Sequence, residues 1–199
     1  TPIASSAASD VYKRQIYNKP IKEKLILKRI QEIKDSGGIA AVSGTPLAAI
    51  KYKNLVKDSG ADLFFLQATV VSTEHLGKEG SQNLDLYDLC ENIGIPVAVG
   101  NCVTYEVSLK LMKAGAAAVM VGIGPGAACT SRGVLGVGIP QATAISDCAA
   151  ARDDFQKESG KYVPIIADGG IITGGDICKC IACGADSVMI GSPIARSQE

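Results

Sequence analysis

The 199-residue sequence is poor in several features that would assign a protein to a class at once. It has no tryptophan, only three phenylalanines and one histidine, and its 20 acidic residues balance its 20 basic residues. A zero net charge gives no electrostatic case for binding nucleic acids or acidic lipid surfaces. No apolar run approaches the roughly 20 residues of a membrane span. We therefore expect no nucleic-acid partner and no membrane partner.

Disulfide and zinc frameworks are also lacking. The seven cysteines are an odd number and no secretory signal is visible, so we expect reduced thiols and a cytoplasmic location. Cys178, Cys180 and Cys183 lie within six positions, but in a helical pattern without the spacing or the nearby histidine of a zinc site. We expect these three cysteines to serve as small core residues.

The chain is 47% hydrophobic and 20% charged, which suits one domain with a sizeable core. Its start departs from the rest, because residues 10–15 read Asp-Val-Tyr-Lys-Arg-Gln, the translation of the end of a sequencing-library adapter. We therefore interpret residues 1–15 as a non-native read-through tail and assign residues 16–199 to the folded domain. An ordinary polar tail is the alternative interpretation.

Short apolar runs alternate with segments of helical spacing along the remaining chain. The apolar runs predict strands at residues 39–42, 62–67, 96–100, 117–122, 164–167 and 187–190. The helical spacing predicts helices at residues 21–35, 46–59, 85–93, 104–114, 140–159 and 174–183. Because repeated strand–helix units of this kind place helices outside a parallel sheet, the predicted fold class is α/β.

Glycine-rich loops follow several of the predicted strands. They favour a (β/α)8 TIM barrel, whose active site gathers at the carboxyl ends of its strands, and a doubly wound sheet is the alternative. A complete barrel runs to about 250 residues, and only six strand–helix units are countable here. The sequence therefore predicts an incomplete TIM barrel.

Residues 122–141 contain the most informative of these loops. Gly122, Gly124 and Gly126 precede Cys129, and three further glycines follow it. Glycines let the backbone turn sharply and approach a ligand closely. A thiol held at the end of a buried strand is a candidate nucleophile. A buried and inert thiol is the alternative.

Two further glycine motifs end predicted strands, Asp168-Gly169-Gly170 and Gly191-Ser192. Backbone N–H groups left open by glycines bind phosphate, and a serine hydroxyl adds a donor. An ionised aspartate only accepts hydrogen bonds, which suits Asp168 to the two hydroxyls of a ribose. A plain turn is the alternative for each motif.

The loop at residues 122–141 resembles the catalytic loop of the IMP dehydrogenase and GMP reductase family, Gly-x-Gly-x-x-Cys-x-[Thr/Ser]-Arg followed by Gly-Val-Gly-x-Pro-Gln. It looks most like the IMP dehydrogenase-related group that lacks the regulatory Bateman (CBS) domain. The resemblance implies that residues 16–199 form a partial TIM-barrel catalytic domain covering about strands three to eight. It also implies an oxidoreductase of guanine nucleotide synthesis that oxidises IMP to XMP with NAD through a cysteine thioimidate.

The same resemblance implies four groups of site residues. The catalytic residues are expected to be Cys129 and Ser131. The purine nucleotide, IMP or XMP, is expected to bind Asp168, Gly169, Gly170, Gly191 and Ser192. NAD is expected to lie near Gln67, Asn101 and Gly122. A potassium ion is expected to bind the backbone carbonyls of Gly124, Gly126 and Cys129.

Three positions depart from the family pattern. Ala127 stands in place of a phosphate-binding serine, Met120 in place of a lysine or arginine, and Gln67 in place of an aspartate near the nicotinamide ribose. We expect a structural or rim role for His75 rather than a catalytic one. For Arg132, a phosphate-binding or loop-anchoring role and a solvated position stay equally open.

Other functions also stay open. A GMP reductase that uses NADPH shares the cysteine loop and the phosphate loops, and the residues that distinguish it are expected after Glu199, together with the water-activating residue. A catalytically silent purine-nucleotide-binding barrel is a further alternative, although phosphate binding alone needs no thiol. We expect the full-length protein to be a homotetramer and this chain, on its own, to be an inactive fragment.

Overall fold

The structure is a computed structural model, and it describes residues 18–68, 70–71, 84–127 and 129–195. The tail expected at residues 1–15 and the histidine at position 75 lie outside the described residues. Both interpretations therefore stay predictions. The described ranges contain every strand and helix that the sequence predicts.

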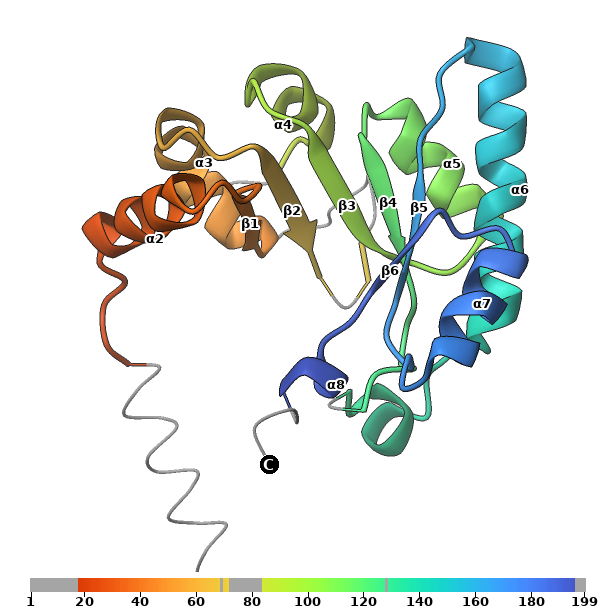
Figure 1. Ribbon diagram of the computed structural model, residues 1–199. Coiled ribbons are helices and arrows are strands. Elements are labelled where there is room, and N and C mark those ends of the chain that lie inside the picture. Colours follow the sequence, from red (N-terminus) through yellow and green to blue (C-terminus); the bar gives the residue numbers. More distant parts are fainter. Residues whose placement is uncertain (1–17, 69, 72–83, 128, 196–199) are drawn as a thin grey trace, which may run out of the picture.

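One parallel sheet forms the centre of the fold. Its strands are β1 (Ala41–Gly44), β2 (Leu63–Gln67), β3 (Val97–Cys102), β4 (Ala118–Val121), β5 (Ile165–Asp168) and β6 (Ser187–Met189). Each strand pairs with the next one in the sequence, so the order never reverses as it does in a doubly wound sheet. Figure 1 shows the sheet curled, with the helices along its outer side. The fold is an incomplete (β/α)8 barrel, which confirms the prediction, and the doubly wound alternative is wrong.

Six longer helices accompany the strands in the described part of the chain, and polar side chains satisfy free backbone N–H groups at the starts of four of them. The six helices are α2 (Glu23–Asp35), α3 (Pro46–Asp58), α4 (Leu86–Asn92), α5 (Tyr105–Lys113), α6 (Gln141–Ser159) and α7 (Gly174–Ala182). The side chains of Thr45, Asp85 and Thr104 accept N–H groups at the starts of α3, α4 and α5. Thr173 and Asp176 form a reciprocal capping box at the start of α7. These caps fix the directions in which the helices leave the loops at the strand ends.

Two short elements and one boundary differ from the sequence prediction. The π-helix η1 (Ser131–Leu135) and the helix α8 (Ser192–Ala195) have too little apolar periodicity to be seen in the sequence. Val134 and Leu135 of η1 are largely exposed. The first strand begins two residues later than expected, because Ile39 is 78% exposed and belongs to the preceding loop. The apolar side chain of Ile39 shifted the predicted strand two residues toward the N-terminus, since the strand itself covers Ala41–Gly44.

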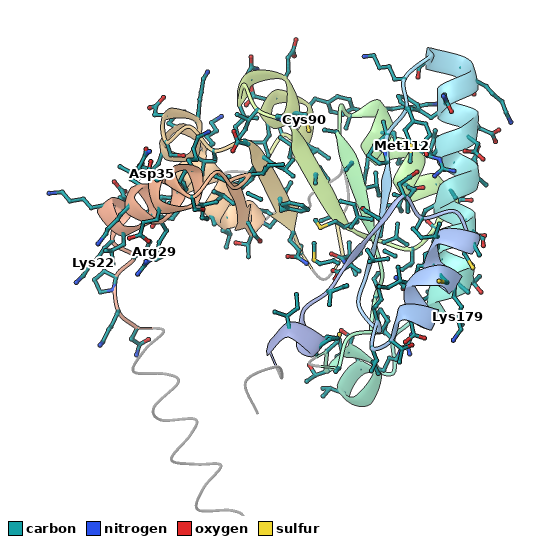
Figure 2. All side chains as sticks on the ribbon, in the orientation of Figure 1. Lys22, Arg29, Asp35, Cys90, Met112 and Lys179 are labelled. Carbon is teal, nitrogen blue, oxygen red and sulfur yellow. The ribbon has the colours of Figure 1, made fainter. Side chains whose placement is uncertain are left out.

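The core lies between the sheet and the helices. Strands β3 and β4 are buried along their whole length, as expected for the middle of a parallel sheet. Figure 2 shows Arg29 on α2 and Lys179 on α7 projecting away from the sheet, whereas Met112 of α5 is 2% exposed. Among the described residues, no helix is long and apolar enough to cross a bilayer.

The cysteines of α7 only partly match their expected role. Cys180 is buried, Cys183 is half-buried and Cys178 is exposed. The prediction that all three are core residues is therefore right for Cys180 and wrong for Cys178, because the helix turns that face toward solvent. In the described part of the chain, no three His, Cys, Asp or Glu residues are grouped as metal ligands.

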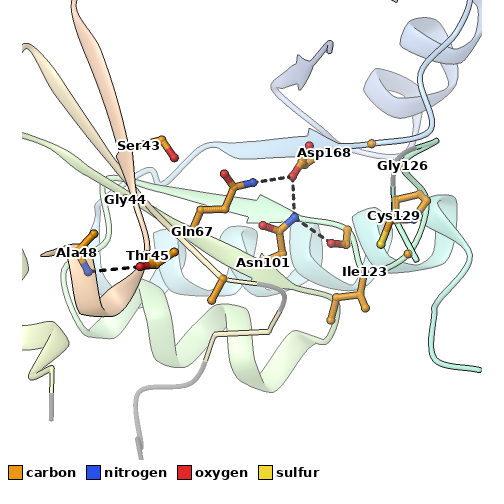
Figure 3. Close-up of a pocket in the computed structure, with 15 residues that line it drawn as sticks. Ser43, Gly44, Thr45, Ala48, Gln67, Asn101, Ile123, Gly126, Cys129 and Asp168 are labelled. Carbon is orange, nitrogen blue, oxygen red and sulfur yellow. Dashed lines mark hydrogen bonds between the residues drawn. The ribbon is translucent and has the colours of Figure 1, made fainter. Parts of the chain in front are cut away.

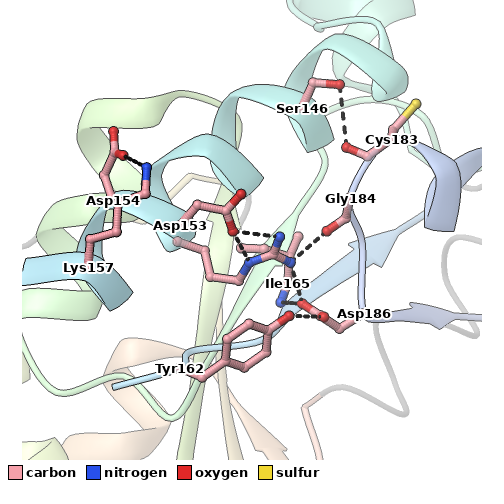
Figure 4. A network of polar contacts seen from close by, with 10 residues as sticks. Ser146, Asp153, Asp154, Lys157, Tyr162, Ile165, Cys183, Gly184 and Asp186 are labelled. Atoms are coloured by element: carbon pink, nitrogen blue, oxygen red, sulfur yellow. Dashed lines mark hydrogen bonds and ion pairs between the residues drawn. The ribbon is translucent and has the colours of Figure 1, made fainter. Parts of the chain in front are cut away.

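A polar network closes the amino end of the sheet, on the side opposite the strand-end loops (Figure 4). Arg152 of α6 is 9% exposed and donates from Nη1 to the carbonyl oxygen of Gly184 at 2.8 Å and to Asp186 Oδ2 at 2.9 Å. Asp186 also accepts the backbone N–H of Ile165 at 2.7 Å and the hydroxyl of Tyr162. The network thus joins α6 to the segments that lead into β5 and β6.

We expect Asp186→Ala to lower the free energy of unfolding by about 2–3 kcal/mol, because it removes the less exposed of the two carboxylates that pair with the mostly buried guanidinium of Arg152 and leaves only that of Asp153. Burial raises the pKa of Asp186, but hydrogen bonds from Tyr162, Ile165 and Arg152 together lower it below its usual value. This carboxylate therefore stabilises the fold at neutral pH, and the contribution is lost as the pH falls through its lowered pKa.

Urea unfolding at pH 7 and at pH 3 measures both effects. The matched control is Asp147→Ala, because Asp147 is an exposed carboxylate on α6, where a substitution is expected to change stability by no more than about 0.5 kcal/mol. If the two variants unfold at the same urea concentration, the proposed importance of the network is wrong.

Candidate active site

Three polar side chains from three strands meet at the carboxyl ends of the sheet. Asp168, at the end of β5, accepts Asn101 Nδ2 at 2.8 Å and Gln67 Nε2 at 3.2 Å on the same oxygen, Oδ2. Figure 3 shows these residues converging at the cavity. Because both amides contact Oδ2, the carboxylate is held in one orientation and its Oδ1 is left to accept other donors.

A shift in strand pairing directs Asn101 into this cluster. Gly100 pairs with Met120 and Cys102 pairs with Val121, so Asn101 is an extra residue between two adjacent pairs. Such an irregularity re-aims a side chain next to an active site. Asn101 is 6% exposed and also donates to the carbonyl oxygen of Gly122 at 2.9 Å. Its Oδ1 is buried without a partner among the described residues, so a bound ligand or water is expected to donate to it.

Cys129 lies on the loop that follows β4, and its thiol is exposed. The alternative of a buried, inert thiol is therefore wrong. Its Sγ lies 3.4 Å from Oγ of Ser131, a residue that is 8% exposed. The hydroxyl and then the backbone N–H of Ser131 lower the pKa of Cys129, with smaller contributions from the N–H of Gly124 and the charge of Arg132. A thiol of this kind ionises more readily than an ordinary cysteine, as a nucleophile requires.

Two adjoining hollows bring the predicted site residues together. The larger has a volume of about 630 Å³, and its lining includes Gln67, Asn101, Gly122, Gly124, Gly126, Cys129, Asp168 and Gly169. The second, of about 350 Å³, is lined by Gly126, Cys129, Asp168, Gly169, Gly170, Gly191 and Ser192, among others. The loops at Asp168-Gly169-Gly170 and Gly191-Ser192 thus line the same hollow as Cys129. The roles of these residues stay predictions.

Ser131 is the predicted site residue that lines neither hollow. It lies beside the thiol of Cys129 and contacts it from within the loop. Arg132 donates from Nη2 to the carbonyl oxygen of Ile139 at 2.8 Å. Of the roles left open for Arg132, loop anchoring is the one that its contacts support.

Two parts of the site were not predicted from the sequence. Gln141 donates from Nε2 to the carbonyl oxygen of Val121 at 2.8 Å and to that of Asp168 at 3.4 Å, so it joins the ends of β4 and β5. Its position at the end of the Gly-x-Pro-Gln motif was the available signal. Ser43 and Thr45, at the end of β1, also line the larger hollow. The rule that sites lie at strand ends could have found them.

A curled parallel sheet with an exposed thiol and an oriented carboxylate at its strand ends has the arrangement typical of (β/α)8 enzymes. Comparison with known proteins makes the class specific. A sequence model described as the IMP dehydrogenase / GMP reductase domain matches residues 22–199, and the chain belongs to this family.

The individual relatives agree with that assignment. The chain is 38% identical to an uncharacterized oxidoreductase of Mycobacterium tuberculosis, over 94% of the chain and 50% of that protein. It is 35% identical to an inosine-5′-monophosphate dehydrogenase of Helicobacter pylori, over 99% of the chain and 42% of that protein. The chain thus spans about half the length of the curated relatives it matches, or less.

A solved structure gives the same result. The crystal structure of an IMP dehydrogenase/GMP reductase-like protein from Corynebacterium glutamicum superposes with a TM-score of 0.84 at 39% sequence identity. The superposition covers 93% of this chain and 48% of that one. The agreement in fold therefore extends over nearly all of this chain.

Proposed function

We propose that this chain carries the substrate-binding and nucleophilic part of an NAD-dependent IMP dehydrogenase of guanine nucleotide synthesis. The observation that carries the proposal is the placement of an exposed thiol with a lowered pKa and an oriented carboxylate in adjoining hollows. The family assignment supplies the substrate class, a purine nucleotide. A catalytically silent nucleotide-binding barrel would not need a thiol whose pKa is lowered.

In the proposed reaction, the Cys129 thiolate attacks C2 of the hypoxanthine ring and forms a carbon–sulfur bond. A bound NAD, held near Gln67, Asn101 and Gly122, would supply the acceptor for the hydride that leaves C2. The resulting thioimidate is hydrolysed by water, which releases XMP and restores the thiol. Ser131 supports the first step, because its hydroxyl and N–H stabilise the thiolate before the attack.

The nucleotide is held by groups on either side of Cys129. Asp168 Oδ1 accepts the ribose hydroxyls, since Oδ2 is occupied by two amides. The loop N–H groups of Gly170 and Gly191, with the hydroxyl of Ser192, bind the phosphate in the smaller hollow. These contacts place the purine ring beside the thiol, which lines both hollows.

The same cavity contains groups suited to NAD and to potassium. The buried, unpartnered Oδ1 of Asn101 fits an N–H donor of a bound cofactor beside Gln67 and Gly122. Carbonyl oxygens of Gly124, Gly126 and Cys129 belong to one short loop and are the type of ligand that potassium accepts. From the family resemblance we also propose a cytoplasmic homotetramer for the full-length protein.

We expect 6-chloropurine riboside 5′-monophosphate to form a covalent adduct on Cys129 of the chain, because the thiolate adds to the electron-poor ring held beside it. Peptide mass spectrometry locates the adduct. Cys129→Ser should abolish it. The matched control is Cys178→Ser, since Cys178 is also exposed but lies on α7 and lines neither hollow.

Protection by unmodified nucleotides tests the substrate. IMP should protect Cys129 at lower concentration than GMP, and a pyrimidine nucleotide should not protect it. Stronger protection by GMP would instead favour a GMP reductase. Labelling of Cys178 as fast as Cys129, with no protection by any purine nucleotide, would contradict the proposal.

A further inference from the structure

Arg132 passes through a narrow gap between two parts of the nucleophile loop. A methyl group added at Gly124 would lie 2.8 Å from Arg132 Cγ, and one added at Gly138 would lie 2.6 Å from Arg132 Nε and 2.7 Å from Cγ. Side chains do not tolerate contacts this short. The arginine stem therefore fills the space that the missing side chains of these two glycines leave open.

The contacts of Arg132 and its neighbours connect the two arms of the loop. We define the inner arm as residues 122–127 and the outer arm as residues 136–139. The Arg132 Nη2 donates to the carbonyl oxygen of Ile139 at 2.8 Å, immediately before the start of α6. The N–H of Val137 donates to the carbonyl oxygen of Ser131 at 3.3 Å, and that of Ile139 to the carbonyl oxygen of Ile123 at 3.4 Å. In the sequence, Cys129 lies between the two arms. The Ile139–Ile123 bond joins the arms directly, and the contacts of Ser131 and Arg132 tie the segment after Cys129 to the outer arm.

We propose that Arg132 is a positioning residue for the nucleophile: its stem, held between Gly124 and Gly138, and its bond to Ile139 fix the loop conformation in which Cys129 contacts Ser131. The proposal rests on the proposed function in that Cys129 is taken as the nucleophile. Arginine suits this role because its planar guanidinium directs its donors in a fixed geometry while the stem packs between backbones.

Loss of this arrangement would release the thiol. Among the described residues that line the two hollows, Asp168 is the charged one, and Arg132 lies outside their lining. If Arg132 leaves its gap, the contact between the Cys129 thiol and Ser131 loosens, so the thiol is held less often in its reactive position.

Gly138→Ala provides the test, because its methyl group displaces the Arg132 stem without removing any polar group. The matched control is Gly133→Ala in the same loop, where an added methyl group meets nothing within 4 Å. Neither glycine has a φ in the left-handed region, so alanine fits the backbone at both positions. The readout is the rate of Cys129 alkylation by iodoacetamide at pH 7, compared with the rate at the exposed Cys178 of the same chain, and it requires no nucleotide.

We expect Gly138→Ala and Arg132→Ala each to slow alkylation of Cys129 by about five- to tenfold while the rate at Cys178 is unchanged. Gly133→Ala should retain the original rates. The double variant Arg132→Ala/Gly138→Ala should react like Arg132→Ala alone, because no stem remains to be displaced. Arg132→Lys should recover part of the rate, since it retains the charge but not the planar donor geometry.

Two results would overturn the proposal: an Arg132→Ala rate at Cys129 equal to that of the original chain, or additive effects in the double variant. Urea unfolding of each variant identifies any loss of fold, which would change the rates at Cys129 and Cys178 together. Failure of the proposed function is recognised separately. In that case the 6-chloropurine nucleotide gives no Cys129 adduct, although iodoacetamide reactivity still depends on Arg132.

Discussion

Gly122→Ala is expected to lower the free energy of unfolding by at least about 4 kcal/mol, which is more than the effect expected for Asp186→Ala. The methyl group would lie 2.2 Å from the carbonyl oxygen of Asp168 and 3.1 Å from both polar atoms of the Gln141 side chain. A φ of +148° adds backbone strain for any other residue. Because the nearest atom belongs to the backbone of β5, it cannot move aside as a flexible side chain would.

The measurement is urea unfolding followed by circular dichroism, with Gly133→Ala as the control. Since that position is open within 4 Å, its substitution is expected to change stability by no more than about 0.5 kcal/mol. Surviving Gly122→Ala protein should also lose nucleotide protection of Cys129, because the end of β5 carries Asp168. Equal stability of the two variants would show that β4 and β5 are not held as closely at their ends as the structure indicates.

Some of the site could be predicted from the sequence, whereas long-range contacts such as the close approach of β5 to Gly122 could not. Cys129 and the motifs at Asp168 and Gly191 are local signals, because each combines a reactive or polar residue with adjacent glycines after an apolar run. The strands themselves were predictable for the same reason: each is a short run whose burial follows from its own sequence. The expectation at residues 39–42 failed by two positions where an exposed Ile39 imitated a buried residue.

The contacts that orient the site depend on residues far apart in the sequence. Asn101 and Asp168 are 67 positions apart, and Gln67 and Asp168 are 101 positions apart. Their convergence depends on the curl of the sheet and on the pairing shift at Asn101, which no local pattern encodes. The resemblance to the family indicated Gln67 as a departure from an expected aspartate and as a neighbour of NAD, but it did not indicate the contact with Asp168. The structure shows that its amide donates to a carboxylate, whereas an aspartate at this position would bring two negative charges together.

Asp168→Asn is expected to weaken nucleotide binding by at least about 100-fold, because the substitution replaces an acceptor by an amide of nearly the same shape. Asn101 and Gln67 both donate to Oδ2, and an asparagine cannot accept both amides and also present an acceptor to the ribose in the same orientation. The measured quantity is the IMP concentration that halves the rate of Cys129 alkylation. The matched control is Asp147→Asn, an exposed carboxylate on α6.

The ligand provides a second test of the same contact. With the original chain, 2′-deoxy-IMP should protect Cys129 less well than IMP, since it lacks one hydroxyl that Asp168 accepts. With Asp168→Asn, the two nucleotides should protect equally, because the partner of that hydroxyl has already been lost. If Asp168→Asn still distinguishes IMP from 2′-deoxy-IMP by the original factor, Asp168 does not bind the ribose. The carboxylate would then serve only to join β2, β3 and β5 at the cavity, and ribose recognition would have to come from another group lining the two hollows.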